Sequence, residues 1–313
     1  MNILVTAIGS MSADCVITSL KKFADKVIGC DIYPSVWHAE SKLCDKCYQA
    51  PFASSENEYI NFLIAICKEH NIEFLIPLTD LEIDVIDHYR AKFQDIHVTL
   101  CMPTHEVLSV ARNKYKLSEL FKDDTEVPSV PTYLGDSDNL STLSFPCIAK
   151  PYNGRSSEGL MRINSVEELN IVRGNKNYIL QEYKEGHIFT VDYVRCAATN
   201  HAFCVAREEL LRTKNGAGLT VKIIDDPSLR RLVSYIGQKL HINGCINMEF
   251  IKNNGDYYLI DINPRFSAGV AFTILVGYNM VVNHMNCFMN KDIDSQIELA
   301  EQILVKRYKE EII

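Results

Sequence analysis

Residues 244–265 read GCINMEFIKNNGDYYLIDINPR, two segments of alternating apolar and polar residues around the turn Asn253-Asn254-Gly255. Such alternation around an Asn/Gly turn predicts a β-hairpin. A three-residue loop would pair Lys252 with Asp256 and place Gly255 in the left-handed region, which glycine adopts without strain. We therefore expect this register, with Gly255 at positive φ.

Four oxygen-bearing side chains lie along this hairpin. Strand alternation puts Asn247 and Glu249 on one face of the first strand, and Asp261 and Asn263 on one face of the second. The three-residue loop makes Glu249 and Asp261 diagonal neighbours on one face, whereas a two-residue loop separates them unless a bulge restores the facing. Carboxylate and amide oxygens suit Mg²⁺. We predict a magnesium site made by Glu249, Asp261 and Asn263, because the apolar neighbours argue against a merely solvent-facing polar side. Arg265 follows and can stabilise developing negative charge.

Upstream residues suggest phosphate binding. Lys150 ends an apolar segment, residues 145–151, and lysine is rarely buried without a partner. The small-residue loop that follows could fold its amides and hydroxyls over phosphates, or it could be a plain hairpin loop. The strand predicted over residues 178–183 ends in alternating polar side chains that can hydrogen-bond to the edge of an adenine base. The candidate ligand-binding residues are Gly154, Ser156, Ser157 and Gly159 in the loop, and Gln181, Glu182 and Tyr183 on the strand.

The two halves of the chain have different patterns. Up to about residue 105, strands and helices alternate, which predicts a parallel sheet covered on both faces. Beyond the proline-bearing segment 127–131, successive strands with few helices predict antiparallel α+β units. The predicted strands are 2–7, 26–31, 73–77, 97–100, 145–151, 159–163, 178–183, 188–195, 203–208, 219–223, 245–251 and 257–263; the predicted helices are 12–23, 57–70, 80–91, 111–121, 166–173, 227–240 and 295–309.

Composition excludes several classes of protein. The 313 residues carry a net charge of −8 and no basic run with interleaved aromatic residues, so we expect no nucleic-acid partner. No apolar stretch is long enough to cross a bilayer, and the N-terminus reads as a strand instead of a signal peptide. Most of the 11 cysteines lie in apolar patterns typical of reduced thiols. We therefore expect a cytoplasmic protein without a membrane partner.

Two further motifs have weak support. The turn at Gly9 and the strand-end Asp31 resemble parts of a dinucleotide site, but there is no G-x-G-x-x-G. An NAD-dependent oxidoreductase is therefore disfavoured. Cys44 and Cys47 form a C-x-x-C pair, but a structural zinc site needs four ligands and the sequence offers no second pair. We expect no metal there.

Taken in order, these motifs resemble the ATP-grasp superfamily, in particular single-module relatives of the carbamoyl-phosphate synthetase large chain and of D-alanine–D-alanine ligase-like carboxylate–amine ligases. The resemblance spans nearly the whole chain, and the run from Asp261 to Gly269 is its most specific part. It implies a Rossmann-like pre-ATP-grasp domain over residues 1–105. A two-lobed ATP-grasp domain would follow, with a phosphate-loop lobe at 106–185 and a metal-binding lobe at 186–313.

The resemblance also implies roles for residues. ATP and Mg²⁺ are the expected cofactors, and Lys114 and Lys150 match the lysines that contact ATP phosphates. Arg265, Lys222 and Arg207 are the expected catalytic or substrate-contacting residues. The expected partners are a small-molecule carboxylate and an amine, and a homodimer is left open.

One position departs from the family pattern. Ile188 stands where the family usually has a Glu that binds both ribose hydroxyls, and Glu185 is a nearby candidate to replace it. Losing a charged hydrogen bond costs about 1.5–3 kcal/mol, or roughly 10- to 100-fold in affinity. The leading hypothesis is a ligase that activates a carboxylate as an acyl phosphate for attack by an amine. The alternatives are a nucleotide-binding protein with little catalysis and a carbamoyl-phosphate-type phosphorylation of a bicarbonate-derived substrate.

Overall fold

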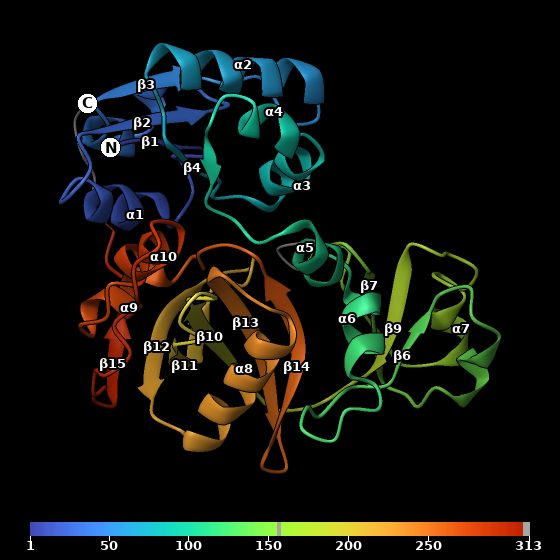
Figure 1. Cartoon of the computed structure of the whole chain (residues 1–313). Helices are drawn as coiled ribbons and strands as arrows, with labels where there is room; N and C mark the ends of the chain where they lie inside the picture. The colour runs from blue at the N-terminus through green and yellow to red at the C-terminus, as the bar shows by residue number, and fades with distance from the viewer. Residues whose placement is uncertain (155–157, 309–313) are drawn as a thin grey trace.

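The computed structural model describes residues 1–154 and 158–308, and it contains three sheets (Figure 1). The first is parallel, with strand order β3-β2-β1-β4-β5, as the strand–helix alternation predicted. Helices lie on both sides of it, so an α/β N-terminal part is confirmed. Its strands are β1 (Asn2–Val5), β2 (Lys26–Asp31), β3 (Lys46–Gln49), β4 (Phe74–Ile76) and β5 (Thr99–Leu100); its helices are α1 (Ala13–Leu20), α2 (Glu56–Glu69), α3 (Asp80–His88) and α4 (Arg90–Gln94), with short 3₁₀ turns η1 (Ser35–Trp37) and η2 (Ala39–Leu43).

Two antiparallel sheets follow, as expected for the α+β part. The four-stranded sheet has the order β6-β9-β7-β8 and the six-stranded sheet the order β14-β13-β10-β11-β12-β15. The smaller sheet contains β6 (Thr132–Leu134), β7 (Cys147–Pro151), β8 (Met161–Ile163) and β9 (Tyr178–Glu182), with η3 (Asp138–Thr142) and α7 (Val166–Leu169); the larger contains β10 (His187–Arg195), β11 (Ala202–Arg212), β12 (Gly218–Ile224), β13 (Gly244–Asn253), β14 (Asp256–Asn263) and β15 (Gln302–Val305), with α8 (Pro227–Lys239), α9 (Val270–Leu275) and α10 (Met280–Phe288).

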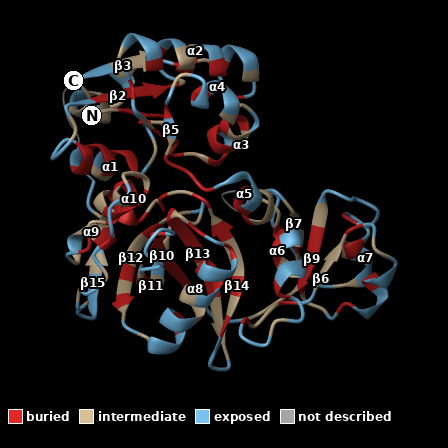
Figure 2. Cartoon of the chain, in the orientation of Figure 1, coloured by how far each residue is buried: buried red, intermediate tan, exposed pale blue. Residues whose placement is uncertain are grey.

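The cores show how these parts fit together. The helix α8 covers one face of the six-stranded sheet, and α10 packs between its other face and α1 of the N-terminal part. The buried residues lie where these helices pack against the sheets (Figure 2). Two helices, α5 (His105–Ala111) and α6 (Lys114–Phe121), lead from the parallel sheet toward the four-stranded sheet.

Several predicted elements were wrong or too long. The helix predicted over 295–309 is absent from its described residues, because residues 302–305 instead pair as β15 with β12. The helix predicted over 111–121 begins three residues later, as α6, because Asn113 caps α6 by accepting hydrogen bonds from the backbone N–H groups of Tyr115 and Lys116. The helices predicted over 80–91 and 166–173 end at His88 and Leu169. Tertiary contacts override local pattern in these segments.

The predicted hairpin register was also wrong. Asn253 pairs with Asp256, so the loop is the two-residue turn Asn254-Gly255, with both residues at positive φ (51° and 96°). The expected positive φ of Gly255 is confirmed. A shift in register follows between Glu249 and the next residue, and Ile260 is the extra residue of this bulge. The bulge returns the two carboxylates to one face.

Candidate functional site

The centre of the candidate site is the face of the β13–β14 hairpin that carries the predicted metal ligands. Glu249 pairs directly with Asp261, and Asn247 pairs with Asn263. The Asn263 Nδ2 donates to Asn247 Oδ1 at 3.1 Å and lies 3.5 Å from Glu249 Oε1. All four side chains thus lie together. This is the arrangement of oxygen atoms that a divalent cation would need from these residues.

Two cations neutralise the carboxylates in the structure. Lys114 Nζ lies 3.0 Å from Asp261 Oδ2 and also donates to the Gly154 carbonyl oxygen at 2.8 Å. Arg212 lies 3.2 Å from Glu249 Oε2. Burial raises the pKa of Glu249, and Arg212 opposes that shift. Because Glu249 and Asp261 attract two protein cations, the same carboxylates could also bind a metal cation.

Lys150 faces the same place from β7. Its Nζ lies 3.4 Å from the Ile260 carbonyl oxygen, at the bulge. Burial lowers the pKa of Lys150 to about 8, while Asp261 opposes that shift. Desolvation of an ammonium group without a close carboxylate is costly. Binding of an anionic group here would relieve that cost.

Lys114 and Lys150 line a cavity of about 240 Å³ between the two antiparallel sheets, which we call the lysine cavity. Its far walls are apolar and include Ile148, Leu160 and Ile188. The predicted base-contacting residues Gln181, Glu182 and Tyr183 line it as well. Gln181 is held by a hydrogen bond to Thr132, Glu182 pairs with Lys184 at 3.0 Å, and the Tyr183 ring contacts Arg162 at 4.4 Å.

A second, polar cavity of about 390 Å³ adjoins the lysine cavity, and we call it the arginine cavity because Arg207, Arg212 and Arg265 line it. The two cavities share Arg212, Glu249 and Asp261. The two candidate ligand carboxylates, Glu249 and Asp261, therefore lie at the boundary between the cavities. A group bound in one cavity would meet a group bound in the other at these carboxylates.

Arg265 connects this site to the N-terminal part of the chain. Its Nη2 and Nε lie 3.0 and 3.2 Å from the two carboxylate oxygens of Asp80, at the start of α3. Its Nη2 also donates to Asn263 Oδ1 at 3.2 Å. Burial alone would raise the pKa of Asp80, but Arg265 and Arg112 hold that pKa below its usual range. The pair fixes the Arg265 guanidinium beside the candidate metal ligands.

Arg207 is buried and fully engaged within the protein. It donates to Asp192 at 2.8 Å, to Glu209 at 3.2 Å and to Ser267 at 3.0 Å. Its three nitrogens thus already have partners, although the side chain lines the arginine cavity. This geometry suits a residue that positions the cavity wall.

The other predicted residues lie in different places. Lys222 is on β12, where its side chain is 42% exposed and forms an ion pair with Glu301 at 3.6 Å, and it lines neither the lysine cavity nor the arginine cavity. Glu185 is exposed, and its carbonyl oxygen accepts from Asn253. Gly154 lines the lysine cavity, and Gly159 adopts a positive φ of 70° two residues beyond the undescribed segment. Ser156 and Ser157 lie outside the described residues.

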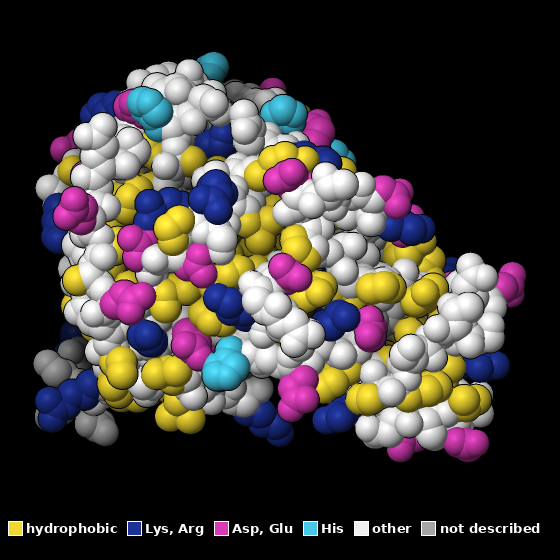
Figure 3. Space-filling view, turned by 90° about the horizontal axis from the view of Figure 1, so that it is seen from below, with side chains coloured by type: hydrophobic (Ala, Val, Ile, Leu, Met, Phe, Trp, Pro, Cys, Tyr) yellow, Lys and Arg dark blue, Asp and Glu magenta, His cyan; other side chains and the backbone are white. Residues whose placement is uncertain are grey.

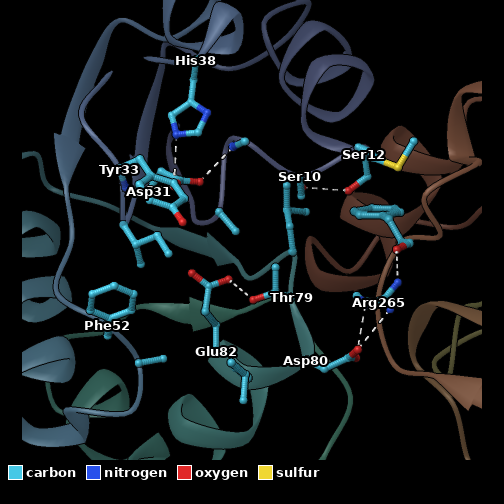
Figure 4. A pocket seen from close by; sticks show the side chains of 18 of the residues that line it. Ser10, Ser12, Asp31, Tyr33, His38, Phe52, Thr79, Asp80, Glu82 and Arg265 are labelled. Carbon is cyan, nitrogen blue, oxygen red and sulfur yellow. Dashed lines mark hydrogen bonds and ion pairs between the residues drawn. The ribbon is translucent and has the colours of Figure 1, made fainter. Parts of the chain in front are cut away.

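A third cavity, of about 510 Å³, lies at the carboxyl ends of β1, β2 and β4 (Figure 4). We call it the strand-end cavity. It shares Met11, Arg265 and Ala268 with the arginine cavity. Of the residues in its wall, the sequence pointed to the turn at Gly9, Asp31 and Arg265, but not to Asp80. The available signal was an acidic residue three positions beyond the strand predicted over 73–77, at the start of the helix predicted over 80–91.

Residues 1–154 and 158–308 contain no group of three or more His, Cys, Asp or Glu side chains arranged to hold a metal ion, so the candidate magnesium set relies on two carboxylates and an amide. None of their helices is long and apolar enough to span a membrane.

The fold and this site define a protein built around an ATP-grasp domain. A family model described as ATP-grasp domain matches residues 111–269, and one described as PylC-like, N-terminal domain matches residues 3–101. Because the first covers half of the chain, the chain belongs to the ATP-grasp family of enzymes, as its motifs predicted.

Individual relatives are distant. The carbamoyl phosphate synthase large chain of Thermoanaerobacter sp. (strain X514) is 20% identical over 190 residues, which are 53% of this chain and 17% of that protein. The chain spans less than a fifth of the length of the curated relatives that it matches.

Solved structures share the fold along most of the chain. The biotin carboxylase domain of Hydrogenobacter thermophilus 2-oxoglutarate carboxylase, solved with MgADP, ADP and bicarbonate, has a TM-score of 0.77 and 17% identity over 93% of this chain and 70% of that one. The N5-carboxyaminoimidazole synthetase of Staphylococcus aureus, solved with ADP, has a TM-score of 0.77 and 17% identity over 95% of this chain and 79% of that one.

Proposed function

We propose that the protein is an ATP-dependent ligase that activates a carboxylate as an acyl phosphate for attack by an amine. The observation that carries this proposal is the placement of Glu249 directly opposite Asp261, between a cavity lined by three lysines and a cavity lined by three arginines. Phosphoryl transfer needs mainly positioning and electrostatic stabilisation of the transferred group. The boundary between the two cavities can supply both positioning and electrostatic stabilisation.

The chemistry assigns each residue a role. ATP binds in the lysine cavity, where Lys114 and Lys150 contact its phosphates and the apolar walls receive the base. Glu249, Asp261 and Asn263 would hold Mg²⁺, which supplies charge neutralisation at the phosphates when it is bound. Two facts fit this assignment. Burial lowers the pKa of Lys150, whose Nζ has a carbonyl oxygen and no close carboxylate as its partner among the residues that the structure describes, and protein cations are bonded to both Glu249 and Asp261.

The proposed reaction has two steps. A carboxylate oxygen attacks the γ-phosphorus of ATP, so that a bond to phosphorus forms while ADP leaves. The amine nitrogen then attacks the acyl carbon, phosphate leaves with the electrons of the carbon–oxygen bond, and the nitrogen loses a proton. Arg265 stabilises the negative charge that develops in both steps.

Further assignments belong to the same proposal. We also propose that the chain divides into domains at residues 105 and 185. The proposed contacts with the phosphates are made by Ser156, Ser157 and Gly159. Glu185 is proposed near the ribose, and Arg207 near the substrates, where it acts through its fixed position in the wall. Lys222 pairs with Glu301 outside the lysine and arginine cavities, so we propose no substrate contact for it. A cytoplasmic location suits the free cysteines of the described residues.

A screen tests the proposal. The full chain is incubated with ATP and Mg²⁺ against a matrix of carboxylates and amines that includes bicarbonate and ammonium, and ADP is measured. We expect ADP release that needs a particular carboxylate and Mg²⁺. Release with bicarbonate alone would favour the carbamoyl-phosphate-type reaction, and AMP as the nucleotide product would contradict acyl phosphate formation.

A second function is favoured by one observation. Ile188 lines the lysine cavity with an apolar side chain, which gives a ribose hydroxyl no hydrogen-bond partner. A nucleotide-binding protein with little catalysis is therefore the second candidate. MgATP binding without ADP release across the whole matrix would support it.

A further inference from the structure

Two partly exposed cysteines, Cys44 and Cys47, lie close together in the N-terminal part of the chain. The structure describes all 11 cysteines, and eight of them are buried. The three that are partly exposed are Cys15, Cys44 and Cys47. Cys44 lies between η2 and β3, and Cys47 is the second residue of β3. The C-x-x-C motif therefore holds two thiols that solvent can reach, and the proposed ligase reaction uses neither.

A glycine of the neighbouring strand leaves room for both sulfurs. Cys47 pairs with Gly29 of β2. A Cβ atom at Gly29 would lie 2.7 Å from the Cys44 sulfur and 3.2 Å from the Cys47 sulfur, so both sulfurs pack over the bare Cα of this residue. A side chain at position 29 would occupy that space. The sheet thus brings the two thiols together before any bond forms between them.

The two thiols differ in acidity. Hydrogen bonding with Cys44 holds the pKa of the Cys47 thiol below its usual range. Hydrogen bonding with Cys47 and burial raise the pKa of the Cys44 thiol. For comparison, burial raises the pKa of the Cys15 thiol to about 12. Because the thiolate is the nucleophilic form of cysteine, Cys47 is the residue suited to attack and Cys44 the residue suited to complete a bond.

Formation of a bond between the two sulfurs would move the end of η2. In a disulfide the sulfurs are about 2 Å apart, which is closer than unbonded sulfurs approach. Cys47 is fixed by its pairing with β2, whereas Cys44 lies outside the sheet. Cys47 Sγ also lies 3.6 Å from the carbonyl oxygen of Ser41, and Ser41 Oγ donates to the carbonyl oxygen of His38 at 2.7 Å. The bond would therefore act on the segment that carries His38.

This segment, residues 35–43, borders the strand-end cavity. His38 Nε2 lies 3.1 Å from Asp31 Oδ1, and Figure 4 shows the ring directed at that carboxylate. The segment also contains Trp37, the one tryptophan of the sequence, whose ring stacks on Tyr33 with centroids 5.8 Å apart. The strand β3 lies at the top of Figure 1, away from the face that Figure 3 shows. The thiol pair thus lies outside the three cavities but next to a segment that borders one of them.

We propose that Cys44 and Cys47 are a redox-active pair that a small-molecule disulfide oxidises to an intramolecular disulfide, and that this bond changes the conformation of residues 35–43. The Cys47 thiolate attacks one sulfur of the small disulfide, so that a mixed disulfide forms and one small thiolate leaves. Cys44 then loses its proton to solvent and attacks the Cys47 sulfur, and the second small thiolate leaves. Two cysteine thiols are oxidised while one small disulfide is reduced.

Peptide mapping of the full chain tests the bond. The reduced protein is incubated with oxidised glutathione and denatured with N-ethylmaleimide to block free thiols, and its tryptic peptides are analysed by mass spectrometry. Trypsin cleaves after Lys42 and Lys46, so a disulfide between Cys44 and Cys47 joins residues 43–46 to residues 47–68. We expect these joined peptides, their loss after reduction with dithiothreitol, and the disappearance of two free thiols per chain. Recovery of both cysteines with the maleimide label would overturn the proposal.

Three single variants separate the roles of the cysteines. Cys44→Ser lacks the residue that completes the bond, so it should accumulate severalfold more mixed disulfide with glutathione at Cys47 than Cys47→Ser accumulates at Cys44. The reverse order would overturn the assignment of Cys47 as the attacking residue. Cys15→Ser is the matched control, since Cys15 is also partly exposed, and it should form the joined peptides as the wild type does.

The fluorescence of Trp37 tests the coupled change in residues 35–43. Its emission should shift when the disulfide forms in the wild type and return on reduction. It should stay constant in the double variant Cys44→Ser/Cys47→Ser under the same treatment. A disulfide that forms without any shift in emission would overturn the coupling. These measurements use neither ATP nor a carboxylate, so their outcome is independent of the proposed ligase function.

Discussion

The carboxylate of Glu249 lies directly across the hairpin from that of Asp261, although the turn alone would put them on opposite faces. The two-residue turn pairs Asn253 with Asp256, and the extra residue Ile260 then shifts the register by one. Because a shift of one residue exchanges the two faces of a strand, this bulge creates the candidate metal site. The carbonyl oxygen of the same residue faces Lys150.

The first prediction concerns these carboxylates. Glu249→Gln or Asp261→Asn should lower ADP release by at least about 100-fold, because each loses a metal ligand whose charge neutralisation contributes several kcal/mol. The protein should remain folded, since both groups face a cavity. Turnover at saturating Mg²⁺ measures the effect, and Glu119→Gln, at a surface ion pair with Lys122, is the control. Near-normal turnover in either variant would remove the metal assignment.

The second prediction concerns Asp80, which positions Arg265. Asp80→Asn should lower kcat about 10- to 100-fold while the KM for ATP changes little, because the lost charged hydrogen bonds fix Arg265 and not the nucleotide. Asp84→Asn is a matched control on the same helix, where Asp84 pairs with Arg112 at 2.9 Å. Equal loss of activity in both variants would indicate a general effect on α3.

The third prediction concerns Ile188. Ile188→Glu should lower the KM for ATP about tenfold, because it supplies an acceptor for ribose hydroxyls in the lysine cavity. The gain should be smaller for 2′-deoxy-ATP, which lacks one hydroxyl. An identical change for both nucleotides would show that position 188 does not contact the ribose.

The fourth prediction concerns the stability of the fold at low pH. Burial lowers the pKa of His284 to about 4, and the ring bonds to the backbone of Cys101 and Cys245, which joins the parallel sheet to β13. The unfolded state, with a pKa near 6.5, binds more protons between pH 6.5 and 4. The contribution of His284 to the free energy of unfolding is therefore complete above pH 6.5 and is lost as the pH falls toward 4.

Denaturant unfolding at several pH values measures this dependence. The wild type should lose on the order of 3 kcal/mol of unfolding free energy over that window from this group. His284→Gln, which does not titrate, should show a flatter profile. Parallel profiles for the two proteins would mean that His284 is not the group responsible.

Much of the architecture followed from the sequence, because alternation of apolar residues reports burial directly. The parallel sheet, the antiparallel strands and the gathering of Glu249, Asp261 and Asn263 were all predicted. A bulge was considered only as an alternative to the three-residue loop. Its position at Ile260 was not predicted, since an extra residue within an apolar run leaves no mark in the alternation. The strand β15 was read as a helix because its partner β12 is about 80 residues away in the chain.

The parts of the site that depend on contacts between residues far apart in the sequence were also not predicted. Asp80 and Arg265 are 185 residues apart, and only the packing of the two parts of the chain brings them together. Lys222 and Arg207 looked alike in sequence, yet one is exposed and the other is buried among Asp192, Glu209 and Ser267. Their different surroundings could not be read from residue type.

The transfer of an oxygen atom tests the central claim most directly. Once the screen has found a carboxylate that supports ADP release, that carboxylate is supplied labelled with ¹⁸O, and the phosphate product is analysed by mass spectrometry. An acyl phosphate intermediate predicts that one ¹⁸O atom passes from the carboxylate to phosphate at each turnover. Phosphate without label, with all of the ¹⁸O retained in the organic product or released in water, would contradict activation of the carboxylate by phosphorylation.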